Sequence, residues 1–83
     1  MHETHPEIIR RLKRADGHLH TVIAMIVEGK PCLDLAQQLH AVESAIAKAK
    51  KELIQDHIEH CLDGQTGDVK SAVRELKQLA KYL

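Results

Sequence analysis

The feature that most constrains the fold of this chain is a helical apolar pattern of about three heptads, within a stretch of about thirty residues that nothing interrupts. From Cys32 to Leu53, apolar side chains recur at alternating steps of three and four residues. This is the spacing of one face of an α-helix. Neither glycine nor proline occurs between Pro31 and Gly64. The pattern predicts one helix of about thirty residues, well above the usual length in globular proteins.

One shorter helix is predicted before the long one and another after it. Residues 6–28 repeat the same apolar spacing, and Pro6 suits the first turn of a helix. Residues 69–83 form a third, shorter amphipathic pattern, with Thr66 as a candidate N-cap. Gly29 and Pro31 separate the first two patterns, and Gly64 and Gly67 the last two. No segment alternates as a strand does, so we expect an all-α, three-helix protomer with a long central helix.

Composition suggests that this protomer does not act alone. The 83 residues include no Trp, no Phe and one Tyr, so aliphatic side chains must build the core, and small domains bury little surface. The central helix is too long for its neighbours to cover, which leaves an apolar seam for a second subunit. We expect a flexible arm over residues 1–5, a single domain over residues 6–83 and at least a dimer. No bilayer-spanning run or secretory signal is evident, which favours the cytoplasm.

The two cysteines and several of the seven histidines lie in a pattern that suits a metal ion. His57 and Cys61 are four residues apart and therefore share one helix face. Cys32 opens the same helix roughly 25 residues earlier, about 37 Å away at the rise of an α-helix. One chain cannot close that gap. If two copies pack antiparallel, Cys32 of one meets His57 and Cys61 of the other, giving two symmetric sites per dimer.

Two thiolates and an imidazole suit soft or borderline metal ions. Cu(I) fits three such ligands, whereas Zn(II), Ni(II) or Co(II) would require a fourth. His2, His5 and His60 are candidates for that fourth ligand. Other interpretations are that Cys32 is a small apolar residue on the seam, or that Cys32 and Cys61 form an intersubunit disulfide, which a reducing cytosol disfavours.

Basic residues gather in two places although the formal net charge is zero. The first cluster lies early in the first helix, and the second in the middle of the long helix. Each could contact phosphates, or each could be an ordinary solvated helix face. No helix-turn-helix, β-ribbon or zinc-finger pattern decides between these interpretations. The two clusters comprise Arg10, Arg11, Lys13 and Arg14, and Lys48, Lys50 and Lys51.

The segment R-L-K-R-A-D-G-H-L from Arg11 to Leu19, the Cys32 that opens the long helix and the H-x-x-x-C that ends it resemble the CsoR/RcnR family of bacterial transcriptional repressors. The resemblance covers about residues 6–83. It implies an antiparallel four-helix-bundle-like dimer that pairs into a tetramer. It also implies binding to operator DNA, with release when an inducer binds across the dimer interface.

The resemblance also implies roles for individual residues. The ligands of the copper-sensing branch fall on Cys32, His57 and Cys61, and Glu75 matches an acidic residue that supports them. Pro31 stands where that branch has a tyrosine. The nickel and cobalt branch adds an N-terminal histidine, for which His2 and His5 are candidates, and a persulfide sensor would have cysteine in place of His57. The DNA-contacting positions fall on Arg11, Arg14, Lys48 and Lys51.

These observations lead to one main hypothesis and two alternatives. The main hypothesis is a repressor that binds operator DNA without metal and releases it on binding a soft metal ion, with Cu(I) as the favoured inducer. The first alternative is a Ni(II)- or Co(II)-responsive repressor that uses an N-terminal histidine. The second is a small metal-storage or trafficking protein without a DNA partner. An enzyme is not expected, because the chain has no Gly-rich phosphate loop and no evident pairing of a base with a nucleophile.

Overall fold

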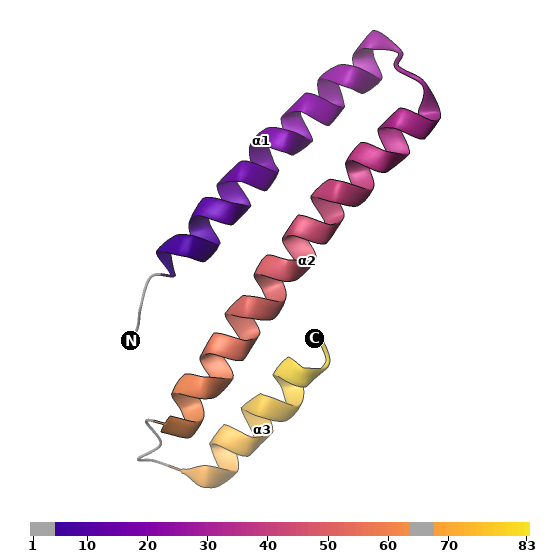
Figure 1. Cartoon of the computed structure of the whole chain (residues 1–83). Coiled ribbons are helices and arrows are strands. Elements are labelled where there is room, and N and C mark those ends of the chain that lie inside the picture. The colour runs from indigo at the N-terminus through magenta and orange to yellow at the C-terminus, as the bar shows by residue number, and fades with distance from the viewer. Residues whose placement is uncertain (1–4, 64–67) are drawn as a thin grey trace. The chain divides into compact units, whose positions relative to one another are not determined.

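The structure is a computed structural model that describes residues 5–63 and 68–83, with residues 61–63 described by their backbone only. It contains three helices, α1 (Pro6–Glu28), α2 (Cys32–Asp63) and α3 (Val69–Ala80) (Figure 1). No strand occurs in the described ranges. The predicted all-α protomer with a long central helix is therefore confirmed, and α2 extends over 32 residues.

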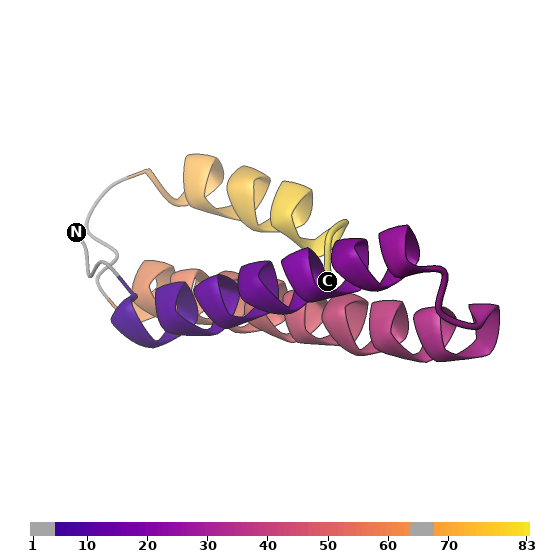
Figure 2. The same cartoon turned by 90° about the horizontal axis from the view of Figure 1, so that it is seen from above.

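The chain divides into two compact units, residues 1–49 and residues 50–83. In the first unit, α1 and the first part of α2 lie side by side and antiparallel, which both views of the molecule show (Figures 1 and 2). The second unit contains the last part of α2 and α3. Among the described residues, no helix has the length and apolar character that crossing a bilayer requires.

The turn between α1 and α2 is set by a glycine in the left-handed region. Gly29 has φ 79° and ψ 32°. Its N–H donates to the carbonyl of Ile26 at 3.0 Å, and the N–H of Lys30 donates to that of Met25 at 3.1 Å. These two bonds form a Schellman motif, which satisfies carbonyls at the end of the helix. Pro31 follows directly and keeps α1 from continuing.

Replacing Gly29 by alanine should lower the free energy of unfolding by about 1 kcal/mol. An added Cβ would meet no atom within 4 Å, so the cost comes from the positive φ alone. Urea unfolding followed by circular dichroism at a fixed chain concentration measures this effect. Gly17→Ala is the matched control, because Gly17 lies within helical α1 with open space around it. The control should gain stability, up to about 1 kcal/mol, and equal stability of both variants would contradict the argument.

The first unit buries small side chains and leaves larger ones exposed. Ala15 and Val22 of α1 and Val42 and Ala49 of α2 are buried, and small residues allow two helices to approach closely. The apolar pattern of each helix is therefore divided: one part lies in the core of the unit, and the other part faces outward. The exposed part comprises Ile9, Leu12, Leu19, Ile23 and Ile26 on α1 and Leu39 and Ile46 on α2, each at least 36% exposed.

The second unit orients α3 by a polar cap and an apolar face. The N-cap is Asp68, whose carboxylate accepts from the backbone N–H of Lys70 and from the hydroxyl of Ser71, both at 3.0 Å. The predicted cap was Thr66, which lies outside the described residues. The observed cap, Asp68, is two residues later. Ala72, Leu76 and Leu79 are half-buried. They share one face of the helix, and this face anchors α3.

Candidate DNA-contacting and metal-binding sites

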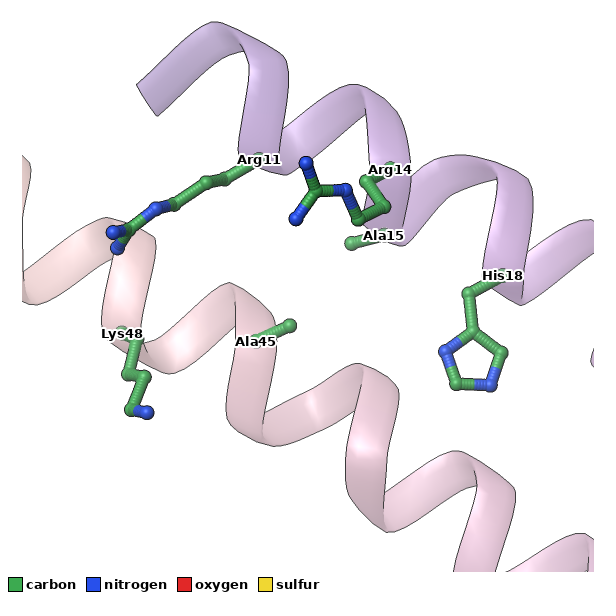
Figure 3. A pocket seen from close by; sticks show the side chains of 6 residues that line it. All are labelled: Arg11, Arg14, Ala15, His18, Ala45 and Lys48. Carbon is green, nitrogen blue, oxygen red and sulfur yellow. The ribbon is translucent and has the colours of Figure 1, made fainter. Parts of the chain in front are cut away.

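Cations from α1 and α2 line a single pocket in the first unit. Arg11 and Arg14 come from α1 and Lys48 from α2, and the pocket has a volume of about 330 Å³. Ala15 and Ala45 also line it and point toward each other from the two helices, and Arg11 extends from α1 toward the turn of α2 that carries Lys48 (Figure 3). Three of the four residues predicted to contact DNA are thus brought together, although Arg11 and Lys48 are far apart in the sequence. The concentration of positive charge suits an anionic partner.

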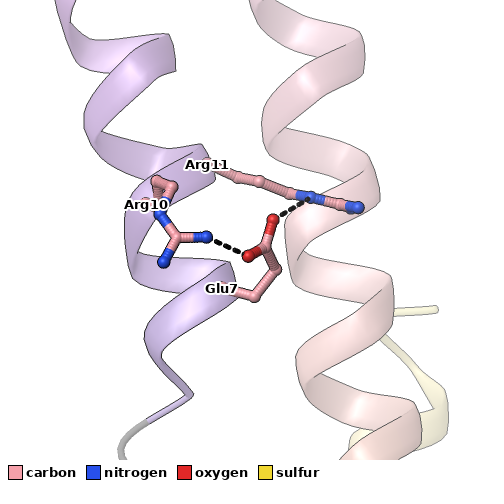
Figure 4. Close-up of polar contacts among 3 residues, drawn as sticks. All are labelled: Glu7, Arg10 and Arg11. Carbon is pink, nitrogen blue, oxygen red and sulfur yellow. Dashed lines mark hydrogen bonds and ion pairs between the residues drawn. The ribbon is translucent and has the colours of Figure 1, made fainter.

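Glu7 holds two of the arginines in the first turns of α1. Its carboxylate forms an ion pair with Arg10 and lies 3.8 Å from Nε of Arg11 (Figure 4). Arg10 is turned to Glu7 and does not line the pocket, whereas Arg11 does. Glu7 therefore lies beside the guanidinium of Arg11, which lines the pocket. Glu7 is a contributor that the sequence pattern did not single out, although its spacing of three and four residues from the two arginines is a signal for such pairs.

His18 completes the pocket and links the two helices. Its Nε2 lies 2.6 Å from Oε1 of Gln38 on α2. His18 was not a predicted site residue, and the structure places it in the lining of the pocket with the cations. His18 is one turn after Arg14, so the spacing along α1 was the available signal.

Lys51, the fourth predicted DNA contact, is exposed on α2. It follows Lys48 by three residues, so both side chains project from the same side of that helix. Lys50, in contrast, is two residues after Lys48 and is turned about 200° around the helix axis.

The candidate metal ligands occupy the two ends of α2. Cys32 is its first residue and is exposed with a free thiol. His57 and Cys61 lie in its last two turns, and the side chain of Cys61 is outside the described set. Among the described residues of one chain, no three His, Cys, Asp or Glu side chains are placed to hold a metal ion. The ligand set therefore stays a prediction.

His57 has a specific acidic neighbour in the second unit. Its Nε2 lies 3.2 Å from Oε2 of Glu75 on α3, and both side chains are about half exposed. A carboxylate that accepts a hydrogen bond from one ring nitrogen fixes the orientation of the ring. The other nitrogen then keeps its lone pair for a metal ion. Glu75 is thus placed as a residue that orients His57.

The remaining candidate histidines have other positions. Nδ1 of His60 is 2.9 Å from the carbonyl of Asp56 and 3.6 Å from its carboxylate, so this ring is turned to its own helix. His5 is the N-cap of α1 with φ 53°, and its carbonyl accepts from the N–H of Ile9. His2 lies outside the described residues.

Comparison with known proteins shows the family of the chain. A model of the family described as metal-sensitive transcriptional repressors matches residues 4–82. The chain is 33% identical over 76 residues to the copper-sensing transcriptional repressor CsoR of Mycobacterium ulcerans, covering 89% of this chain and 65% of that protein. It is 31% identical over 77 residues to the copper-sensing repressor CsoR of Bacillus subtilis, covering 90% and 76%. The chain thus spans somewhat less than two thirds of the length of the Mycobacterium ulcerans relative.

A solved structure extends the likeness to the whole fold. The nickel-responsive transcriptional regulator InrS superposes with a TM-score of 0.84 at 27% sequence identity, covering 100% of this chain and 97% of that one. The family match over nearly the full chain and the shared three-helix fold lead to one conclusion: the chain belongs to the family of metal-sensitive transcriptional repressors.

Proposed function

We propose that this protein is a metal-responsive transcriptional repressor of the cytoplasm, which binds operator DNA without metal and releases it when a soft metal ion binds. The observation that carries the proposal is the pocket that Arg11, Arg14 and Lys48 line, on a chain whose candidate metal ligands lie on α2, the helix that carries Lys48. Membership of the family supports it. Both activities then depend on α2.

The DNA-contacting side of the proposal rests on charge. Phosphate contacts supply most of the sequence-independent affinity of proteins for DNA, and each releases counterions. Arg11, Arg14 and Lys48, with Lys51 one turn further along α2, would contact the phosphate backbone. Operator preference without a recognition helix then comes from the shape and deformability of the duplex.

The metal-binding side rests on the donor set. Cys32, His57 and Cys61 supply two thiolates and an imidazole, which fit Cu(I) better than a hard cation. With Nε2 of His57 directed at Glu75, Nδ1 is the nitrogen that would coordinate. A bound ion would be coordinated by Cys32 of one chain and by His57 and Cys61 of another, and would thereby link the two chains.

The site requires a second chain, and the exposed apolar surface gives that chain a place to pack. Leu39, Ile46 and Leu53 repeat every seven residues on α2, and each is at least 42% exposed. Burial of such a stripe against a copy of itself is the usual basis of helical dimers. We propose an antiparallel homodimer on this stripe, which assembles further to a homotetramer.

Coupling between the two activities needs little energy. A 100-fold loss of DNA affinity corresponds to about 2.7 kcal/mol. Loading of the metal site must therefore favour the conformation with low DNA affinity by about this amount. A shift of α2 is the proposed carrier, because this helix contains Lys48 as well as Cys32 and His57.

Anaerobic fluorescence anisotropy tests the proposal. The reduced, metal-free protein is titrated into a labelled duplex from upstream of its own gene, and Cu(I) or Ni(II) is then added at one equivalent per chain. Binding followed by release with Cu(I) supports the copper-responsive repressor. If the metal-free protein never binds DNA but takes up metal tightly, a storage or trafficking role replaces the proposal.

A nickel-responsive repressor is the second candidate, because the chain superposes on the nickel-responsive regulator InrS. Ni(II) requires more than three ligands, and His2 or His5 would supply the fourth. Removing residues 1–5 should therefore cripple a nickel site, with a loss of Ni(II) affinity of at least about 10-fold, and leave a three-ligand copper site intact. Competition titrations with chelators for each metal measure both affinities. Equal losses for both metals would contradict this distinction.

A further inference from the structure

The third helix and its C-cap, Lys81, carry a stripe of four cations that the proposed function does not use. Lys70, Arg74, Lys77 and Lys81 follow one another at steps of four, three and four residues. At 3.6 residues per turn they fall within an arc of about 60° around the helix axis. These four residues, here named the α3 stripe, are all of the lysines and arginines that follow Lys51 in the chain.

The α3 stripe is exposed, and no acid among the described side chains pairs with it. All four side chains are exposed, and none forms an ion pair among the described residues. In contrast, Arg10 and Arg11 pair with Glu7, and Lys30 lies 3.8 Å from the carboxylate of Glu28. The positive charge of the stripe is therefore fully presented to solvent.

The acids nearest to the stripe are engaged elsewhere. Glu75 is the one acidic residue within α3, and it contacts His57. Asp68 accepts from the N–H of Lys70 and the hydroxyl of Ser71, so its carboxylate caps the helix. Glu75 and Asp68 therefore do not neutralise the side-chain charges of the stripe, which can pair with an external anion.

The face of α3 opposite the stripe is the more buried one. Ala72, Leu76 and Leu79 are half-buried and lie roughly 200° from the centre of the stripe. Val69 and Val73 border the stripe and line a groove with three of its cations. The main apolar face of α3 is thus partly covered, and of the described residues only Val69 and Val73 are exposed apolar residues next to the stripe, which is a small apolar surface for insertion into lipid.

We infer that the α3 stripe is a second DNA-contacting surface, which binds the phosphate backbone of the duplex that the repressor occupies. This inference rests on the proposed function. The stripe spans about 16 Å along the helix, and duplex DNA carries one negative charge per about 1.7 Å of its axis. The four cations complement this partner in sign, and their spacing of about 4 Å per charge is close to the roughly 3.4 Å per phosphate along one strand of the duplex. The contribution is independent of DNA sequence, since it reads phosphates and not base edges.

The test compares two variants of equal net charge. The stripe variant replaces Lys70, Arg74, Lys77 and Lys81 by glutamine. The control variant replaces four other exposed cations by glutamine, outside both the stripe and the pocket, namely Arg10, Lys13, Lys30 and Lys50. Anisotropy titrations of the reduced, metal-free proteins with one 40-base-pair operator duplex are repeated at several salt concentrations. Circular dichroism at 222 nm checks that each variant keeps the helix content of the wild type.

The stripe variant should bind the duplex at least about 10-fold more weakly than the control variant and show a shallower salt dependence. The slope of log affinity against log salt falls by about 0.9 for each phosphate that the protein no longer neutralises. Equal affinities and equal slopes for the two variants would overturn the inference while the repressor function stands. Wild-type protein that never binds DNA would overturn both. Retained DNA binding with loss of binding to phosphatidylserine vesicles would assign the stripe to a lipid surface instead.

Discussion

Replacing Cys32 by alanine should abolish the metal response while DNA binding by the metal-free protein persists. In the wild type, saturating Cu(I) is expected to weaken operator binding about 100-fold, equal to about 2.7 kcal/mol. In the variant, the change should be less than about twofold, because the remaining donors, His57 and Cys61, belong to one chain and can no longer be linked by the metal ion to Cys32 of the other chain. Cys32 is exposed at the start of α2, so its replacement leaves the core intact. Anaerobic anisotropy with and without Cu(I) measures both quantities.

His60→Ala is the matched control for this prediction. His60 also lies near the end of α2, but its ring is turned to Asp56. This variant should keep the full response. Release of DNA from the Cys32 variant by one equivalent of Cu(I) would show that the site does not include Cys32. Loss of DNA binding by the metal-free variant would instead assign Cys32 a structural role.

The second large effect is expected from the cationic pocket. Combined replacement of Arg11 and Lys48 by alanine should weaken operator binding by the metal-free protein roughly 100-fold near physiological salt, because two phosphate-binding cations are removed from each subunit. The slope of log affinity against log salt should fall by about 1 for each cation removed. Metal affinity should stay within about twofold of the wild type, since neither residue is a candidate ligand.

The chain offers a control that removes the same charges from neighbouring positions. Arg10 is adjacent to Arg11 and also pairs with Glu7, but it does not line the pocket. Lys50 is exposed and projects from the other side of α2 from Lys48. The double variant Arg10→Ala with Lys50→Ala should therefore bind the operator within about threefold of the wild type. Equal losses of affinity in both double variants would mean that net charge, and not the pocket, governs binding.

The helices were predictable because their boundaries carry strong local signals. Pro6 starts α1, Gly29 and Pro31 end it, and the predicted bounds of α1 agree with those observed. Apolar spacing alone, however, did not distinguish residues that pack within the chain from residues that stay exposed on it. Val42 is buried within the chain, whereas Leu39 on the same helix is 42% exposed. Periodicity reports that a residue belongs to an apolar face and cannot report whether the face packs against its own chain.

Most residues of the candidate sites could be predicted from the sequence, whereas their contacts could not, because the contacts depend on how the helices pack. Arg11 and Lys48 were recognisable as members of two basic clusters, but only the antiparallel packing of α1 and α2 places them at one pocket. Glu75 followed from the family resemblance, and its contact with His57 depends on the packing of α3. The proposed union of Cys32 with His57 would depend on a second chain, whose placement no local pattern specifies.

Complementation between two inactive variants tests most directly the claim that the metal site is shared between chains. Chains with Cys32→Ala are mixed in equal amounts with chains with His57→Ala, and tight Cu(I) sites are counted anaerobically by competition with a chromophoric chelator. Each variant alone should show none. After subunit exchange, half of the dimers contain one chain of each kind and regain one intact site, which gives about 0.25 tight sites per chain. A mixture that binds no more Cu(I) than its separate components would contradict a site formed across the dimer.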